Sequence, residues 1–536
     1  MNKLLKNKLF LYATEFFSGM SVMAVELGAS RLLAPYFSSS QIVWTIIIGT
    51  IMIAMALGNI YGGKAADKTP EPAKLYGRII IAAIWIALIP VLGKYIILGI
   101  SGLLIVTVSN GFLIIAAFIA CMVIFVFPLF LLGTVTPSLA RFTMDSVDES
   151  GKIVGTLGAY NTVGSIIGTF LPTFVTIPSV GTSITFLIFS GVLLILAILF
   201  FVYEQKKEKS QTVKIIVGII VFIIAVIFGA RDSFAFWEDN LMYEGESVYN
   251  YLQVKDTDES VILSTNVLFG VQSIMMKDKE LTGMYYDYAM AAPLMADVTD
   301  NEKDHKMLVL GMGTGTYARQ CRKYYPNMST KGVEIDGDII KLSRAYFDLS
   351  EDIEVVEYDG RAYLNADKNK YDVIMVDAYQ DITIPFQMSS IEFFSLVAEH
   401  LEDDGVMVVN MNMQTDEPDN ICDYLEDTIS AVFPNVYTAR VLRNTNCELF
   451  ASFNPDMMDN FTCNLEAMED GELKSFLTGV KDSYVAYEPG DLILTDDKAP
   501  VELLGIQVID SIIEREVKYY KEIYKEQGIE GIINSI

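Results

Sequence analysis

The chain has 536 residues, which is more than one ordinary domain requires. It combines 52% hydrophobic residues with a formal net charge of −28, two values that agree only if apolar and acidic residues occupy different parts of the chain. Residues 1–230 are mostly apolar, whereas most acidic residues follow residue 235. The composition therefore predicts a membrane domain followed by an acidic soluble domain. It argues against nucleic acid as a partner, because the phosphate backbone requires a basic surface.

Long apolar runs predict an all-α polytopic membrane domain over residues 1–230. A helix needs about 20 apolar residues to cross the hydrocarbon core of a bilayer. Seven runs reach that length: 9–34, 41–62, 77–97, 111–136, 154–176, 182–203 and 213–230. The run at 98–109 is shorter, so the sequence is compatible with six to eight spans and indicates about seven.

Basic residues are concentrated in alternate loops of this region. The loops that carry them contain Lys64, Lys68, Lys74, Arg78, Arg141, Lys152, Lys206, Lys207, Lys209 and Lys214. The positive-inside rule then predicts a multi-pass protein of the cell membrane with its N-terminus in the cytoplasm. Seven spans place the soluble domain outside the cell, and eight place it in the cytoplasm.

The first span contains ionisable residues, which are candidates for function wherever they lie within a membrane. These residues are Glu15, Glu26 and Arg31. Glu26 and Arg31, five residues apart, form either a structural pair that helps helices pack or part of a transport site. Four glycines around Asn161 predict close helix packing. They are Gly155, Gly158, Gly164 and Gly168.

The soluble half begins with an aromatic, acidic linker at 231–245. Alternating apolar and polar residues follow, and they predict short strands. The stretch from Thr282 to Ala296 has the pattern of a helix. We therefore expect a small β-domain with its connecting helix over 246–296.

The next part of the chain has the pattern of a Rossmann-like, methyltransferase-like α/β domain, expected over 297–510, with a C-terminal helix or tail at 511–536. Four apolar strands each run into a glycine loop or a carboxylate. Ligands of open α/β sheets bind outside the carboxyl ends of the strands, and a ribose-binding acid stands about 20 residues beyond the glycine loop. The candidate nucleoside-binding residues are Gly311, Gly313, Thr314, Gly315, Glu334, Asp336, Asp359 and Gly360. The 5 cysteines show no metal-ligand spacing, so we expect no metal site.

Several motifs of this half resemble those of spermidine synthases, the polyamine aminopropyltransferases, in the form that carries an N-terminal multi-span membrane domain. The motifs are Glu246-Ser-x-Tyr249, Gly270-Val-Gln272, Val333-Glu-Ile-Asp336, Tyr358-Asp-Gly-Arg-Ala-Tyr363, Tyr371-Asp-Val-Ile-Met-Val-Asp-Ala378 and Leu494-Thr-Asp-Asp-Lys-Ala-Pro500. The resemblance implies transfer of an aminopropyl group from decarboxylated S-adenosylmethionine to an amine acceptor such as putrescine. It implies no prosthetic group, and a homodimer formed through the soluble domain.

The resemblance also implies roles for individual residues. Asp377 corresponds to the base that deprotonates the attacking amine, and Asp381 helps to hold the polyamine. Glu334 holds the ribose hydroxyls, and Asp359 with Gly360 holds the adenine. Gln272 contacts the sulfonium nucleoside, and the residues assigned to the substrate pocket are Tyr286, Asp287 and Tyr379.

This sequence departs from the family pattern at three places. Thr314 stands where the family's glycine loop carries an aspartate that binds the aminopropyl ammonium. Tyr286-Asp287-Tyr288 replaces a Tyr-(His/Gln)-Glu segment, and Asp381 lies four residues after Asp377 instead of three. Two alternatives therefore stay open: another S-adenosylmethionine-dependent enzyme, such as a methyltransferase, and a transporter or sensor whose soluble domain only binds a nucleoside.

Overall fold

The computed structural model comprises two compact units. The first contains the helices up to residue 238 together with residues 245–251, and the second contains residues 239–244 and the chain from 252 onward. The described residues are 8–37, 40–104, 111–144, 150–203, 209–230, 233–266, 271–298, 303–378, 384–415, 417–442, 444–508, 511, 518–519 and 523.

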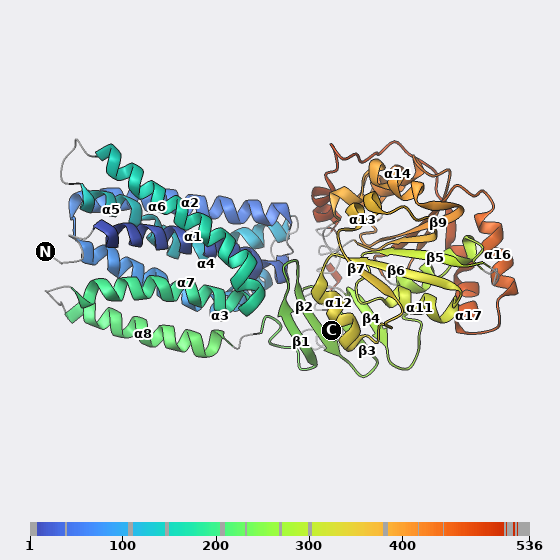
Figure 1. Ribbon diagram of the computed structural model, residues 1–536, viewed down its shortest axis with the longest axis horizontal. Coiled ribbons are helices and arrows are strands. Elements are labelled where there is room, and N and C mark those ends of the chain that lie inside the picture. The colour runs from blue at the N-terminus through green and yellow to red at the C-terminus, as the bar shows by residue number, and fades with distance from the viewer. Residues whose placement is uncertain are drawn as a thin grey trace. The chain divides into compact units, whose positions relative to one another are not determined.

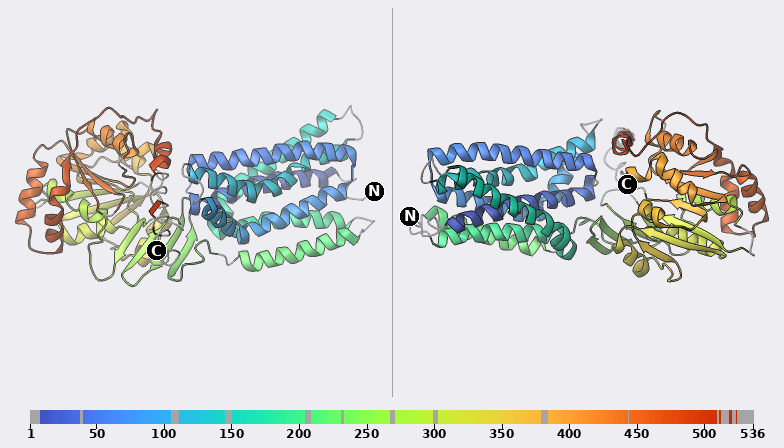
Figure 2. Two further views of the ribbon diagram at one scale, coloured as in Figure 1. Left: turned by 180° about the vertical axis from the view of Figure 1, so that it is seen from behind. Right: turned by 45° about the horizontal axis from the view of Figure 1, so that its top comes forward.

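Long helices make up most of the first unit and run side by side (Figures 1 and 2). They are α1 (Lys8–Phe37), α2 (Gln41–Lys68), α3 (Pro72–Leu104), α4 (Phe112–Gly133), α5 (Val135–Thr143), α6 (Ser150–Leu171), α7 (Ile177–Val202) and α8 (Lys209–Gly229). Within the described residues, 6 helical stretches are long and apolar enough to cross a membrane. The all-α polytopic character predicted from the sequence is thereby confirmed.

The predicted number of about seven spans differs from these 6 stretches because one of them, Ser150–Val202, contains both α6 and α7. A π-helical turn, Pro172–Thr176, connects the two helices. Gly181 near the start of α7 has a φ of 79°, which is not a helical value and marks a kink. The two apolar runs predicted at 154–176 and 182–203 thus correspond to α6 and α7, with the kink between the two runs, and the predicted number of spans roughly matches the structure.

Close packing of α1 against α6 depends on two of the four predicted glycines. A Cβ atom at Gly164 would lie 2.0 Å from the carbonyl oxygen of Phe16, and one at Gly168 would lie 2.1 Å from that of Met20. The packing prediction is confirmed for these two positions. It is wrong for Gly155 and Gly158, where a Cβ atom would meet nothing within 4 Å.

Glu15 lies fully buried on α1 and binds neutral partners. Thr136 donates its hydroxyl hydrogen to Oε1 of Glu15 at 2.5 Å, and the amide of Asn161 donates to the same oxygen at 2.9 Å. The other oxygen, Oε2, has no hydrogen-bond partner among the described residues. Glu15 therefore joins α1 to α5 and α6 through polar contacts inside the helical unit.

The second unit starts with a small antiparallel sheet of order β1-β2-β3-β4. Its strands are β1 (Leu241–Glu246), β2 (Tyr251–Asp256), β3 (Ser260–Ser264) and β4 (Ser273–Met276). Two short helices, α9 (Tyr285–Ala289) and α10 (Ala292–Met295), lead from it into the larger sheet. This is the small β-structure with a helical connection that the sequence predicts.

The larger sheet has the strand order β12-β10-β11-β9-β8-β5-β6-β7. Its strands are β5 (His305–Leu310), β6 (Met328–Glu334), β7 (Glu354–Glu357), β8 (Tyr371–Val376), β9 (Leu401–Met411), β10 (Asn435–Arg440), β11 (Cys447–Ser452) and β12 (Tyr484–Ala486). The five strands from β7 to β9 are parallel, and β11, β10 and β12 extend the sheet in antiparallel fashion. The predicted Rossmann-like fold is confirmed.

Helices cover both faces of this sheet, and the strands therefore bury both sets of alternating side chains. The helices are α11 (Thr316–Tyr324), α12 (Gly337–Tyr346), α13 (Gly360–Ala366), α14 (Ile391–Glu399), α15 (Ile421–Ser430), α16 (Met457–Ala467) and α17 (Glu472–Val480). Figure 1 shows α13 and α14 on one face and α11 on the other. Met375 and Val408 belong to the core that α9 and α11 cover, whereas Val376 and Val409 belong to the core that α14 and α15 cover.

The α1–α6 contact generates a stability prediction. We expect Gly164→Ala to lower the melting temperature of the full-length protein in detergent, because the added methyl group meets the carbonyl oxygen of Phe16. Overpacking of this kind costs about 1–3 kcal/mol. Gly155→Ala in the same helix is the matched control and should leave the melting temperature unchanged. Equal melting temperatures for the two variants would contradict the close packing.

Candidate active site

The strand order of the larger sheet reverses at β5. The chain passes from β5 outward through β6 and β7, then returns to the other side of β5 with β8. Loops that leave the carboxyl ends of β5 and β8 in opposite directions form a crevice, which is where ligands of such sheets bind. The glycine-rich loop after β5 and Asp377 after β8 both stand at this place.

The glycine-rich loop lies directly against the end of β8. Gly311 has a φ of 80°, and a Cβ atom there would lie 2.5 Å from the Cα atom of Ala378. Gly315 also has a positive φ, 84°, and caps the start of α11. The backbone N–H of Gly313 donates to Oε2 of Glu334 at 2.8 Å. Glycine is needed at these positions because other residues rarely adopt such backbone angles.

Glu334 ends β6 beside this loop, and its side chain is 7% exposed. Its Oε1 accepts a hydrogen bond from the backbone N–H of Asp336 at 3.0 Å, while Oε2 accepts the bond from Gly313. Burial raises the pKa of Glu334 to about 6, against the lowering effect of these N–H groups. The structure thus fixes the orientation of a carboxylate at the edge of the crevice.

Two further predicted residues begin helices. Asp336 accepts from the backbone N–H of Asp338 at the start of α12, and Asp359 accepts from that of Ala362 at the start of α13. An aspartate at this position satisfies an N–H group that the first turn of a helix leaves unpaired. Gly360 follows Asp359, and a Cβ atom there would lie 3.2 Å from Cε of Met388.

Asp377 is the most constrained carboxylate of the site. Oδ2 accepts a hydrogen bond from the Tyr285 hydroxyl at 2.8 Å, and Oδ1 accepts one from the amide of Asn410 at 2.8 Å. Burial raises the pKa of Asp377 to about 7; the two hydrogen bonds lower it, and the charge of Glu334 raises it further. A carboxyl group with such a pKa can take up or release a proton near neutral pH.

Tyr285 connects the Asp377 carboxylate to two further predicted residues, Tyr286 and Gln272. The rings of Tyr285 and Tyr286 are 3.9 Å apart between centroids, and the Tyr286 hydroxyl donates to the backbone carbonyl of Gln272 at 3.1 Å. The structure therefore brings these two predicted residues to the same crevice as Asp377.

Thr314 occupies the glycine loop with its backbone N–H donating to the hydroxyl of Ser273 at 3.1 Å. The Thr314 side chain is 2% exposed, and its hydroxyl oxygen has no hydrogen-bond partner among the described residues. A buried hydroxyl without a partner is uncommon in folded proteins, so this oxygen is available to a ligand.

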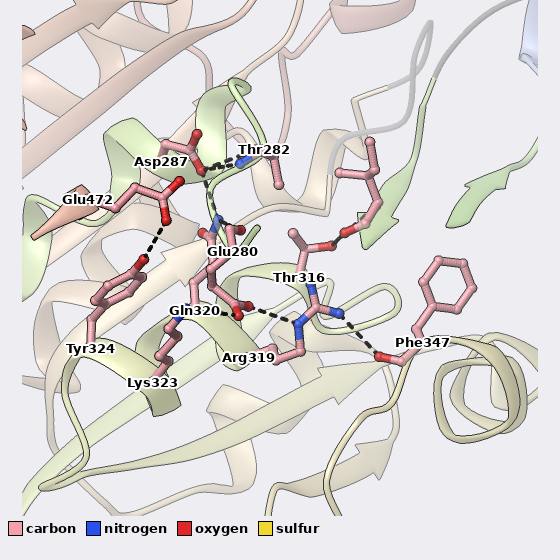
Figure 3. A network of polar contacts seen from close by, with 11 residues as sticks. Glu280, Thr282, Asp287, Thr316, Arg319, Gln320, Lys323, Tyr324, Phe347 and Glu472 are labelled. Atoms are coloured by element: carbon pink, nitrogen blue, oxygen red, sulfur yellow. Dashed lines mark hydrogen bonds and ion pairs between the residues drawn. The ribbon is translucent and has the colours of Figure 1, made fainter. Parts of the chain in front are cut away.

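The carboxylate of Asp287 accepts hydrogen bonds from other residues of the protein. Its Oδ1 accepts from the backbone N–H and the hydroxyl of Thr282 and from the amide of Gln320, and its Oδ2 accepts from the N–H of Gly283 (Figure 3). Burial raises the pKa of Asp287.

The two remaining predicted residues, Tyr379 and Asp381, lie outside the described residues.

The loop near the C-terminus that contains Asp496 is bound to α13. Arg361 forms two hydrogen bonds of 2.7 Å with the two oxygens of Asp496. The paired geometry fixes the direction of both groups.

Three polar residues of the site were not identified from the sequence. They are Tyr285, Asn410 and Glu448. Asn410 interrupts the apolar run of β9 and Glu448 that of β11, so an isolated polar residue in a buried strand was the available signal. Which residues such a polar side chain contacts depends on the register between strands, and the sequence alone does not supply that register.

A glycine loop and buried carboxylates at the reversal of a mostly parallel sheet define the methyltransferase-like class of nucleoside-binding domains. Residues 284–454 match the family model of the spermine/spermidine synthase domain. The chain is also 50% identical over 345 residues to a probable polyamine aminopropyl transferase of Bifidobacterium longum, covering 61% of this chain and 76% of the relative. The chain belongs to the polyamine aminopropyltransferase family and is a transferase.

Two further matches are more distant. A polyamine aminopropyltransferase of Vibrio vulnificus is 25% identical over 41% of this chain and 75% of its own length. The solved spermidine synthase of Thermotoga maritima matches 46% of this chain and 85% of its own, with 22% identity and a TM-score of 0.38.

The hydrogen bonds of Asp287 generate the prediction of this subsection. We expect Asp287→Ala to destabilise the folded protein by about 3 kcal/mol, because the buried N–H and amide donors lose their acceptor and each unsatisfied donor costs about 1–3 kcal/mol. Chemical unfolding followed by tyrosine fluorescence measures the change. Glu472→Gln, whose carboxylate meets only the exposed Tyr324 hydroxyl at 3.5 Å, is the control and should change stability little. A smaller loss for Asp287→Ala than for this control would show that the network does not stabilise the fold.

Proposed function

We propose that this protein transfers an aminopropyl group from decarboxylated S-adenosylmethionine to an amine acceptor, with Asp377 as the general base. The observation that carries the proposal is the half-buried Asp377 carboxylate at the reversal of the sheet, held by Tyr285 and Asn410. Family membership supplies the type of reaction, and the position of Asp377 supports its role in it.

The nucleoside is proposed to lie along the carboxyl ends of β5, β6 and β7. Glu334 holds the ribose hydroxyls, because its carboxylate is fixed beside the glycine loop by the N–H groups of Gly313 and Asp336. Asp359 and Gly360 lie at the end of β7, where the adenine is expected. The sulfonium then comes near β8, where buried carboxylates favour a positive charge.

The reaction needs one proton transfer and one substitution. The amine nitrogen loses a proton to Asp377 and attacks the methylene carbon bonded to the sulfonium. A C–N bond forms, the C–S bond breaks, and its electron pair leaves with sulfur as neutral methylthioadenosine. The sulfonium is a good leaving group, so holding the two reactants in line and removing the proton supply the main catalytic effects.

Thr314 supports a second candidate function, methyl transfer from intact S-adenosylmethionine. An aspartate at this position favours the ammonium of the decarboxylated tail and repels the carboxylate of the intact one. The uncharged hydroxyl of Thr314 has no such preference, and it lies buried without a partner among the described residues. Assays with both nucleosides distinguish the two functions by their products, methylthioadenosine or the demethylated nucleoside.

The long apolar helices support anchoring of the enzyme in a lipid bilayer. Dimer formation through the soluble unit and the side of the membrane on which that unit lies stay predictions. A reporter fused to the C-terminus reads out the side directly.

The role of Asp377 gives a first prediction. Asp377→Asn should lower kcat at least 1,000-fold, because the amide cannot accept the proton, while the affinity for methylthioadenosine changes less than threefold. Release of methylthioadenosine from the decarboxylated donor measures turnover, and calorimetry measures binding.

Glu334→Gln serves as the counterpart of this variant. It should weaken methylthioadenosine binding at least tenfold, since it alters the ribose contact while keeping the base. Full turnover by Asp377→Asn, with the donor and an amine present, would remove Asp377 from the mechanism.

The raised pKa of Asp377 predicts the pH dependence. A base must be ionised to act, so kcat/KM should fall as pH drops through about 7, where Asp377 becomes protonated. Tyr285→Phe removes a hydrogen bond that lowers this pKa and should move the acidic limb of the profile to higher pH. An acidic limb that Tyr285→Phe leaves in place would assign the titration to another group.

A further inference from the structure

The turn that follows α8, residues 233–238, carries two exposed aromatic side chains. Phe236 is 43% exposed, and Trp237 is 39% exposed. Their ring centroids are 4.9 Å apart, and the ring of Tyr95 on α3, which is 51% exposed, lies 4.9 Å from that of Phe236. The three rings belong to the first unit and form one aromatic cluster on its surface. The mechanism proposed above does not use this cluster.

The backbone of the turn is bound to the helices α3 and α1. Lys94 of α3 donates to the backbone carbonyl of Ser233 at 2.8 Å, and the Tyr36 hydroxyl of α1 donates to that of Phe234 at 3.3 Å. Ala235, the next residue, is 1% exposed. The turn is therefore fixed while its two following aromatic rings point outward. Contiguous exposed apolar side chains of this kind mark a surface that a partner or a membrane covers.

The aromatic cluster continues the exposed apolar surface of the long helices. The end of α8 packs on α3, since a Cβ atom at Gly229 would lie 3.4 Å from Cγ2 of Val91. Phe228 of α8 is 62% exposed, and Leu92, one helical turn before Tyr95 on α3, is 45% exposed. In a bilayer these side chains face lipid, so the cluster lies at the border of a lipid-facing surface.

Lys94 indicates that this border is polar. Its Nζ lies 4.5 Å from the centroid of the Phe236 ring and 5.2 Å from that of the Tyr95 ring. An ammonium group is costly in the middle of the hydrocarbon core and is accommodated near the headgroups. Tryptophan and tyrosine concentrate at the same level, because one end of each ring is apolar and the other makes hydrogen bonds.

The length of α3 agrees with this level. Lys74 near the start of the helix is exposed and forms an ion pair with Glu71 at 3.2 Å. From Lys74 to Tyr95 the helix rises by about 31 Å, at 1.5 Å per residue. The hydrocarbon core of a bilayer is about 30 Å thick. A charged residue and an aromatic residue thus stand one bilayer thickness apart on the same helix.

From these observations we infer that Tyr95, Phe236 and Trp237 insert into the interfacial layer of a lipid bilayer. The partner is the boundary between headgroups and acyl chains, which gives the rings apolar contact and the indole N–H access to water. The inference rests on the proposed anchoring in a bilayer. It adds the depth at which the helical unit lies and assigns the turn at 233–238 to the membrane surface.

The test measures tryptophan fluorescence of the full-length protein in lipid nanodiscs. The chain has 3 tryptophans, so Trp44→Phe combined with Trp85→Phe leaves Trp237 as the reporter. Lipids brominated near the headgroup should quench Trp237 at least twofold more strongly than lipids brominated near the ends of the acyl chains. Quenching of Trp237 by aqueous iodide alone places the cluster in solution, and quenching by neither agent places it beneath another protein surface. Either result overturns the inference.

Trp85 is the matched control, because it lies on α3 midway between Lys74 and Tyr95. It is half-buried, and its ring is 5.1 Å from that of the exposed Phe127. The variant that keeps only Trp85 should be quenched most strongly by lipids brominated near the chain ends. Failure of every brominated lipid to quench Trp85 would refute the proposed anchoring itself. Quenching of Trp85 without quenching of Trp237 would refute only the inference about the cluster.

A second measurement changes one exposed residue and leaves the interior intact. Trp237→Phe should reduce the wild-type quenching by lipids brominated near the headgroup, and it should leave the quenching by lipids brominated near the chain ends unchanged. The remaining signal comes from Trp44 and Trp85. Equal headgroup-level quenching in this variant and the wild type contradicts the inference.

Discussion

Burial of carboxyl groups at the carboxyl edge of the larger sheet is the constraint on which the site depends. Glu334 ends β6 and Asp377 follows β8, on either side of β5, and burial raises the pKa of both. The fold tolerates them because backbone N–H groups, a tyrosine and an asparagine bind them.

The same constraint explains the arrangement around Asp377. Asn410 and Tyr285 hold Asp377 in one orientation, and they do so from strands and helices that are rigidly packed on one face of the sheet. Asp287 does not share in this task, because its bonds fix the loop before α9. Asp377 and Asp287 thus differ in their surroundings: Tyr285 and Asn410 bind Asp377, whereas Thr282, Gly283 and Gln320 bind Asp287.

In the helical unit, the packing of helices depends on the size of the side chains between them. Gly164 and Gly168 let α6 touch the backbone of α1, and Glu15 sits beside that contact with Thr136 and Asn161. The carboxyl group of Glu15 is thus held by neutral partners, as are those of Glu334 and Asp377 in the second unit.

The sequence alone determined the helical and Rossmann-like classes, because apolar run length and the strand–glycine–carboxylate order are local properties. It also indicated Asp377, Glu334 and the glycine loop, since these stand at predicted strand ends. Only the tertiary structure decided which glycines of α6 meet α1, and which groups bind the Asp287 carboxylate. It alone joined Asn410 and Glu448 to Asp377, because register between strands distant in sequence is set by packing and not by any local pattern.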